Sequence, residues 1–387
     1  MAVADLVDAA AGEPVLVVGA LPPQGRDLDL LARPAAAARL AEALRANGFE
    51  QSERQWVRFA DGTAEVVDLV PVADWRLPVA ESEALFARAL PIAGFSALVA
   101  PAPADELLSV ARKVARSGRL SDGRRARVAA AVAADPSAWE TATERSASWG
   151  LPGALVRLRT TYQSDPGSLT TPPTDPGSSL RAALWRARQR PRIVTFSGLD
   201  GAGKTSQAEA LARALTALGY RAEIEWTRIT HERAALDRVG LPAKQLLPRR
   251  GPALTWLWTF VVSWANGRSQ RRAARGHPGA VVIHDRYTLD SAAHLRAKYG
   301  AARRFRPQVA LVRWLSPRPV AAYFLDVDAA TAHARKPEKY TVERLAEIAD
   351  LYREECPRLG VQRLDGSRPA DDIAAHVARE VWRRLAP

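Results

Sequence analysis

The chain has 387 residues, a formal net charge of +13 at neutral pH and 47% hydrophobic residues. This length predicts two domains, each with enough residues to bury a core of its own. The single cysteine, Cys356, excludes a disulfide framework within the chain and any zinc site built on cysteines. The sequence shows no signal peptide and no run apolar enough to span a bilayer, so we expect a cytoplasmic protein without a membrane partner.

The strong positive charge is mostly arginine. A nucleic-acid partner would fit this charge, but the sequence contains no dense basic block, no aromatic-interleaved RNA motif and no zinc finger. We therefore expect no nucleic-acid partner, and part of the arginine surplus suits a site for a small polyphosphate.

The first half of the chain opens with a predicted strand over residues 14–18. Residues 25–31 follow as an extended segment, in which Asp27 and Asp29 point to the same side. Leu28 and Leu30 point to the other side, into a core. Two carboxylates on one side of an extended segment can bind a divalent metal.

A further strand over residues 64–70 adds Asp68 as a third candidate metal ligand, beside Asp27 and Asp29. The pattern resembles the polymerase-β-like nucleotidyltransferase fold over about residues 12–75. This resemblance implies an α+β domain. A β-hairpin with solvated acids is the alternative.

The pattern of residues 104–133 predicts amphipathic helices that carry a basic stretch. We interpret this stretch as a solvated face or as a binding surface for an anionic substrate near the carboxylates of Asp27 and Asp29. Beyond them, residues 161–188 are rich in Pro, Gly, Ser and Thr and cannot bury a core. We therefore expect a nucleotidyltransferase-like domain over 1–160, a linker over 161–188 and a second domain over 189–387.

In the second half, short apolar β-branched runs alternate with longer helical patterns. The predicted strands lie at 192–197, 221–225, 280–284, 320–326 and 362–364. The predicted helices lie at 205–218, 342–355 and 371–385. This alternation predicts an α/β fold with a parallel sheet and helices on both faces.

The most informative stretch contains G-x-x-x-x-G-K-T from Gly198 to Thr205, the phosphate-binding loop pattern. Its glycines let backbone N–H groups turn around a polyphosphate, Lys204 adds charge for the β- and γ-phosphates, and the Thr205 hydroxyl can ligate Mg²⁺. The predicted nucleotide-binding residues are Gly198, Leu199, Asp200, Gly201, Ala202, Gly203, Lys204, Thr205 and Ser206.

A second motif, Asp285-Arg286-Tyr287, follows the predicted strand over 280–284. Ligands of such sheets bind at the carboxyl ends of strands, so Asp285 is expected to face the metal and the phosphates. Arg286 could stabilise charge on a transferring phosphoryl group. A surface ion pair after a strand is the alternative reading.

The loop and its flanks resemble the thymidylate kinase family, which carries F-x-G-x-D-G-x-G-K-[ST]-[ST]-Q. The matching residues are Phe196, Gly198, Asp200, Gly201, Gly203, Lys204, Thr205, Ser206 and Gln207. The resemblance extends over about residues 190–387 and implies a P-loop kinase that uses ATP and Mg²⁺.

The resemblance also implies roles for individual residues. Lys204, Asp285, Arg286 and Arg335 would be catalytic, and Thr205 and Asp285 would hold the metal. Arg335, Lys336 and Lys339 fall where the family has a mobile lid, although a solvated basic helix end fits them as well. The substrate side would comprise Arg228, Phe260, Arg268 and Tyr287, although Phe260 also fits the core of an apolar helix.

The acceptor side departs from the family pattern. After Arg228, residues 229–231 lack the expected acidic residue, proline and glycine. Where the family runs S-x-x-A-Y-Q, this chain has Asp290, Ala293, His294 and Leu295. The family default of dTMP as acceptor therefore rests on resemblance alone.

The leading expectation is ATP-dependent phosphoryl transfer to a nucleoside monophosphate, dTMP to dTDP by default. The alternatives are a kinase of another nucleoside or small molecule, a metal-dependent nucleotidyltransferase in the first half, and a nucleotide-binding regulator. The resemblance also suggests a homodimer.

Overall fold

A computed structural model describes residues 2–22, 27–52, 54–118, 120–164, 192–226, 252–300, 305–337 and 340–385. The chain divides into two compact units, which are described separately. One comprises Met1–Arg58 with Glu65–Asp175, and the other comprises Phe59–Ala64 with Pro176–Pro387. No helix among the described residues is long and apolar enough to cross a membrane.

The N-terminal unit is built on a mixed sheet with strand order β3-β4-β5-β2-β1-β7-β6. Strand β2 pairs antiparallel with β1 and parallel with β5. The strands are β1 Val15–Val17, β2 Leu28–Ala32, β3 Glu50–Ser52, β4 Gln55–Ala60, β5 Thr63–Pro71, β6 Leu90–Pro91 and β7 Leu98–Ala100. The helices are α1 Val3–Ala11, α2 Pro34–Ala46, α3 Val79–Ala87, α4 Pro103–Ser117, α5 Asp122–Ala134, α6 Ala138–Arg145 and α7 Pro152–Gln163.

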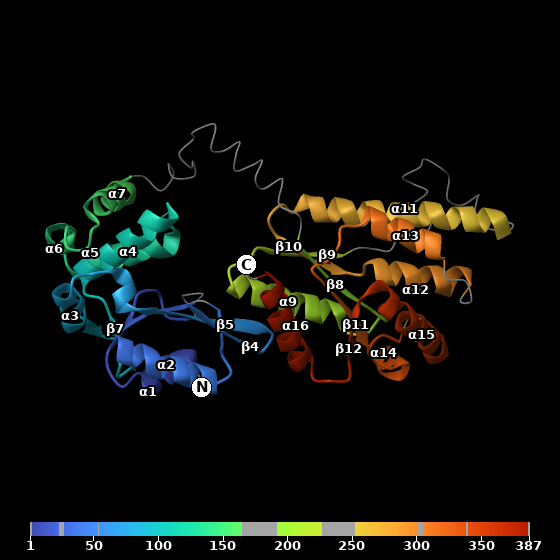
Figure 1. Ribbon diagram of the computed structural model, residues 1–387, viewed down its shortest axis with the longest axis horizontal. Helices are drawn as coiled ribbons and strands as arrows, with labels where there is room; N and C mark the ends of the chain where they lie inside the picture. The colour runs from blue at the N-terminus through green and yellow to red at the C-terminus, as the bar shows by residue number, and fades with distance from the viewer. Residues whose placement is uncertain are drawn as a thin grey trace. The chain divides into compact units, whose positions relative to one another are not determined.

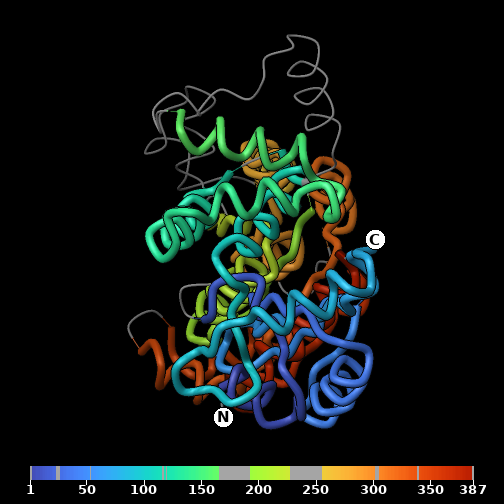
Figure 2. The backbone as a smooth tube through the Cα atoms, turned by 90° about the vertical axis from the view of Figure 1, so that its left-hand side faces the viewer, coloured from blue at the N-terminus to red at the C-terminus, as the bar shows by residue number. Residues whose placement is uncertain are grey.

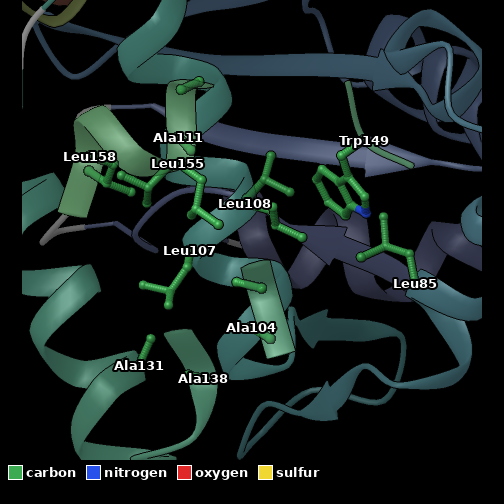
Figure 3. Packing of buried hydrophobic residues seen from close by; sticks show 14 of the residues in the cluster. Leu85, Ala104, Leu107, Leu108, Ala111, Ala131, Ala138, Trp149, Leu155 and Leu158 are labelled. Atoms are coloured by element: carbon green, nitrogen blue, oxygen red, sulfur yellow. The ribbon is translucent and has the colours of Figure 1, made fainter. Parts of the chain in front are cut away.

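Alternation along the strands sends apolar side chains to two separate cores in this unit. Leu28 and Leu30 point into a core, as the sequence predicts, and they pack there with residues of α1 and α2. Leu31 faces the opposite core, where Leu107 and Leu108 of α4 pack against α3 and α5–α7. Figure 3 shows this second core, and Figure 2 shows α1 and α2 apart from the helices that begin with α4. Helix α7 continues three residues into the segment expected to be linker.

The C-terminal unit contains a parallel sheet with strand order β12-β11-β8-β10-β9. Its strands are β8 Arg192–Gly198, β9 Ala222–Trp226, β10 Val281–Asp285, β11 Ala321–Asp326 and β12 Gln362–Asp365. Its helices are α9 Lys204–Ala217, α11 Pro252–Gly276, α12 Thr288–Tyr299, α13 Arg306–Leu315, α14 Ala329–Arg335, α15 Val342–Leu359 and α16 Ala370–Leu385.

Helices cover both faces of this sheet, with α9 and α16 on one side and α11, α12, α13 and α15 on the other (Figure 1). The central strands β8 and β10 are buried along their length apart from the first residue of β8, because both of their faces are covered. This α/β architecture is compatible with a P-loop kinase fold. All five predicted strands and all three predicted helices of this half are present, with bounds shifted by a few residues at most.

Candidate functional site

The phosphate loop connects the central strand β8 to the start of α9, so its backbone lies at the carboxyl edge of the sheet. Gly201 has a φ of +87°, and a Cβ atom there would lie 2.3 Å from the backbone oxygen of Ala332 in α14. Only glycine fits this position, both for its left-handed backbone and for the close approach of α14. The loop is therefore shaped by its contact with α14.

Lys204 is buried at the first turn of α9. Its ammonium donates hydrogen bonds to the backbone oxygens of Gly198, at 3.1 Å, and Leu199, at 2.7 Å. Burial lowers the pKa of Lys204, and the neighbouring positive charge of Arg286 lowers it further. An anion in the loop would therefore relieve the electrostatic cost of two cations held close together.

Asp285 ends β10, the strand next to β8, and its carboxylate is 2% exposed. Its Oδ2 accepts hydrogen bonds from the Thr205 hydroxyl, at 2.8 Å, and from the Trp226 indole N–H, at 2.9 Å. Its Oδ1 is buried and has no hydrogen-bond partner among the described residues. The structure thus brings together the two predicted metal ligands, Thr205 and Asp285, and leaves one carboxylate oxygen unsatisfied.

Sequence reasoning did not identify Trp226 as a site residue. Trp226 ends β9, which pairs with β10 at the edge of the sheet, so its side chain reaches Asp285 across the strand pair. The available signal was that Trp226 lies two residues before Arg228, which the family resemblance places on the substrate side. The residues around Trp226 do not indicate that its strand pairs with the strand of Asp285, so the contact could not be predicted from them.

Arg286 is held by two carboxylates. Its guanidinium forms an ion pair with Asp200 of the phosphate loop and lies 3.9 Å from Asp290. Burial lowers the pKa of Arg286, but the negative charges of Asp290 and Asp200 outweigh it and raise the pKa overall. Its φ of +80° is unusual for a non-glycine residue and is typical of functional positions. The site thus keeps this cation charged and fixed beside the loop.

Asp290 is fully buried and connects this arginine to two further elements. It caps α12 by accepting a hydrogen bond from the Tyr287 backbone N–H, at 2.9 Å. Its other oxygen accepts a hydrogen bond from the Tyr352 hydroxyl of α15, at 2.7 Å. Burial, followed by the charge of Asp290, raises the pKa of Tyr352, so the hydroxyl keeps its proton and remains a donor.

A cavity of about 600 Å³ adjoins the phosphate loop. Its wall includes Gly198–Asp200 of the loop, Trp226 of β9, one face of α12 and residues of α15. Asp290, Ala293 and His294, which replace the family's acceptor-side residues, all lie on this wall. Among the described residues, four cationic side chains line the cavity against two carboxylates, Asp200 and Asp290: Arg286, Lys298, Lys336 and Arg344.

The expected substrate residues lie away from this cavity or outside the described chain. Phe260 packs edge-on against Trp256 of the same helix, and Arg268 lies over the Trp264 ring. Tyr287 is 1% exposed, and its hydroxyl donates to the Pro317 backbone oxygen at 2.7 Å. None of the three lines the cavity, because α11 packs against α13 and Tyr287 turns into the core. Arg228 lies outside the described residues.

The predicted lid residues lie at the end of α14 and directly after it. The Arg335 guanidinium lies 3.5 Å from the backbone oxygen of Gly201, at the phosphate loop, and Lys336 lines the cavity. The side chain of Asp328 caps the start of α14 by accepting a hydrogen bond from the Thr331 backbone N–H. The Arg335 side chain is therefore close to the phosphate loop. Lys339 is outside the described residues.

The carboxylates of the N-terminal unit are arranged differently. Asp29 and Asp68 occupy paired positions on β2 and β5, and Asp29 forms an ion pair with Lys113 of α4. Burial and the charge of Asp29 raise the pKa of Asp68. A Cβ atom at Gly19 would lie 2.6 Å from an Asp29 carboxylate oxygen, so the glycine makes room for this side chain.

Among the described residues, no three His, Cys, Asp or Glu side chains are grouped so that they could hold a metal ion. The metal site expected from Asp27, Asp29 and Asp68 stays a prediction: the charges of Asp29 and Asp27 both raise the pKa of Asp68, and Lys113 pairs with Asp29. The basic stretch is also engaged within the unit, since Arg112 donates to the Trp75 backbone oxygen and Arg127 pairs with Glu106.

The chain was compared with families of proteins and with individual known proteins. No model of a protein family matches the chain. A thymidylate kinase of Ruegeria pomeroyi is 25% identical over 206 residues, which cover 50% of this chain and 95% of that protein. A probable thymidylate kinase of Pyrobaculum calidifontis is 26% identical over 202 residues, covering 50% of this chain and 97% of that protein. A third, from Pyrobaculum aerophilum, is 30% identical over 115 residues, 28% of this chain and 58% of that protein. Over about half of its length, the chain is thus similar to thymidylate kinases.

Proposed function

We propose that the C-terminal unit transfers the γ-phosphoryl group of ATP to a nucleoside monophosphate, with dTMP as the first acceptor to test. The observation that carries this proposal is the cavity of about 600 Å³ that begins at the phosphate loop and holds more cationic than anionic side chains. An acceptor bound there would meet the end of a triphosphate held by the loop. The excess positive charge favours an acceptor that is itself an anion.

The loop side supplies the phosphate donor. Backbone N–H groups at the start of α9 would bind the phosphates of ATP, and the Lys204 ammonium would exchange its bonds to loop oxygens for phosphate oxygens. Thr205 and Asp285 fit a magnesium ion, because Asp285 Oδ1 is buried and lacks a hydrogen-bond partner in the described part of the chain. Bound there, Mg²⁺ would neutralise phosphate charge and orient the phosphates.

The transfer itself depends on positioning and on charge. Arg286, held by Asp200 and Asp290, would face the transferring group and stabilise its negative charge. Arg335 would approach from α14, whose contact with Gly201 already brings it to the loop. Lys336 and Arg344 on the cavity wall would hold the anionic part of the acceptor.

The acceptor's identity is the open part of this proposal. His294 lies on the cavity wall in place of the family's tyrosine, and Leu295 is buried in place of the amide. Another nucleoside monophosphate, a nucleoside or another small molecule is therefore the second candidate. A nucleotidyltransferase in the N-terminal unit and a nucleotide-binding regulator remain the alternatives from other classes.

The test is ADP release from ATP and Mg²⁺ by the purified full chain, with a panel of nucleoside monophosphates and nucleosides that includes dTMP. Stimulation by dTMP supports the complete proposal, and stimulation by another acceptor supports the kinase with a different substrate. Tight ATP binding with no stimulation by any acceptor contradicts the kinase and favours a regulator.

A further inference from the structure

Trp226 is the last residue of β9, and its side chain forms part of the cavity wall beside the phosphate loop. It is 61% exposed, so burial alone does little to fix the position of its ring. Its indole N–H donates a hydrogen bond to Asp285 Oδ2, at 2.9 Å. Neither the phosphate loop motif nor the Asp-Arg-Tyr motif includes this residue.

The two carboxylate oxygens of Asp285 differ in their hydrogen bonds. Oδ2 accepts hydrogen bonds from two donors that lie on different elements, Thr205 on α9 and Trp226 on β9. Oδ1 is buried and receives no hydrogen bond from the described part of the chain. Two fixed donors on one oxygen determine the orientation of the carboxylate, and therefore where the other oxygen lies. An unsatisfied buried carboxylate oxygen is costly unless a ligand uses it.

We propose that Trp226 is a positioning residue for the metal side of the nucleotide site. Its indole N–H holds Asp285 Oδ2, so that Oδ1 remains available to the magnesium nucleotide bound by the loop. Thr205 alone would constrain the carboxylate less, because a carboxylate held by one hydrogen bond can still turn about it, and the Thr205 hydroxyl is also expected at the metal. The inference rests on the proposed function for the identity of the ligand, but not on the identity of the acceptor.

A phenylalanine at this position keeps a smaller aromatic ring and cannot donate a hydrogen bond, so Trp226→Phe tests the indole N–H. The experiment is calorimetric titration of the full chain with ADP, once with Mg²⁺ and once with a chelator. We expect Mg²⁺ to increase the affinity of the wild type, and Trp226→Phe to reduce this gain about three- to tenfold, the size of one typical net hydrogen bond. Affinity in the chelator should not change.

Trp314→Phe is the matched control, because Trp314 is 77% exposed on α13 and does not line the cavity. It should behave like the wild type. An unchanged or larger magnesium gain in Trp226→Phe would overturn the inference, and so would an equal loss of affinity with and without metal. The inference would also be overturned if the ADP affinity of the wild type did not depend on Mg²⁺.

The titration uses binding and not turnover, so the proposed function can fail separately. If the wild type binds ADP in a metal-dependent way, and Trp226→Phe loses that dependence, the inference holds even when no acceptor stimulates ADP release. In that case only the kinase proposal fails.

Discussion

Both units present carboxylates at their sheets, but the two sets are neutralised in different ways. In the C-terminal unit, Asp285 accepts hydrogen bonds from the uncharged groups of Thr205 and Trp226. In the N-terminal unit, Asp29 is paired with the ammonium of Lys113. Neutral donors orient a carboxylate and leave its negative charge for a cation, whereas an ammonium consumes that charge. On the proposed function, we therefore expect the metal nucleotide to bind at the C-terminal unit.

The largest expected effect comes from the loop lysine. Lys204→Ala should lower acceptor-stimulated ADP release about a hundred- to a thousandfold, because it removes the cation beside the transferring phosphates. The control is Lys113→Ala, which removes the ion-paired lysine of the N-terminal unit and should leave ADP release unchanged. Circular dichroism checks that both variants are folded. Retained activity in folded Lys204→Ala would contradict the assignment of the site.

The second test compares the two carboxylates directly. Asp285→Asn keeps an oxygen that can accept from Thr205 and Trp226 but removes the negative charge. ADP release should fall about a hundredfold, with a matching loss of magnesium dependence. Asp29→Asn should leave both quantities unchanged. The comparison breaks down if the two variants lose activity to the same extent.

A smaller effect should follow from the hydrogen bond between α15 and α12. Tyr352→Phe keeps the ring that stacks on Phe324, at 5.3 Å between centroids, and removes the donor to buried Asp290. We expect a loss of about 1–3 kcal/mol in the free energy of unfolding of the C-terminal unit, the usual cost of an unsatisfied buried group. Urea unfolding measures it, and an unchanged midpoint would show that Asp290 does not need this donor.

The pH dependence of the C-terminal unit should include His284, which is buried in β10. Burial lowers its pKa from 6.5 to about 4, so the folded state favours the neutral ring. Its contribution to stability is complete above pH 6.5 and is lost as the pH falls towards 4. His284→Leu should therefore gain stability relative to the wild type over this interval, by urea unfolding at several pH values. A pH-independent difference would count against the shifted pKa.

The N-terminal unit should show the opposite dependence through Asp68. Burial and Asp29 raise its pKa, so the charged form destabilises the folded state, and stability falls as the pH rises from about 4 through the raised pKa. Asp68→Asn should raise the melting temperature at neutral pH and should have less effect near pH 4. A lower melting temperature at neutral pH would indicate that the charge of Asp68 is stabilising.

Much of the C-terminal unit could be predicted from the sequence, because its signals are local. The phosphate loop is eight residues long, and its strand, turn and helix follow from the residues themselves. The meeting of Thr205 and Asp285 follows from the rule that ligands bind at the carboxyl ends of parallel strands. The pattern of Leu28 and Leu30 in the N-terminal unit was likewise readable from alternation.

The remaining features depend on tertiary packing. Tyr287 follows the Asp-Arg pair, but its backbone caps α12 and its ring turns into the core. Phe260 and Arg268 lie on α11, whose packing against α13 keeps them off the cavity wall. The pairing of Asp29 with Lys113 joins residues 84 positions apart, which no local pattern encodes.

The most direct test of the account is the fate of the two phosphorus labels of ATP. The full chain is incubated with Mg²⁺, the acceptor panel and ATP that carries distinguishable labels at the α and γ phosphorus. We predict that the γ label moves to an acceptor while the α label stays in ADP, and that Lys204→Ala slows this transfer about a hundred- to a thousandfold. Transfer of the α label with release of pyrophosphate, dependent on Asp29 and Asp68, would contradict it.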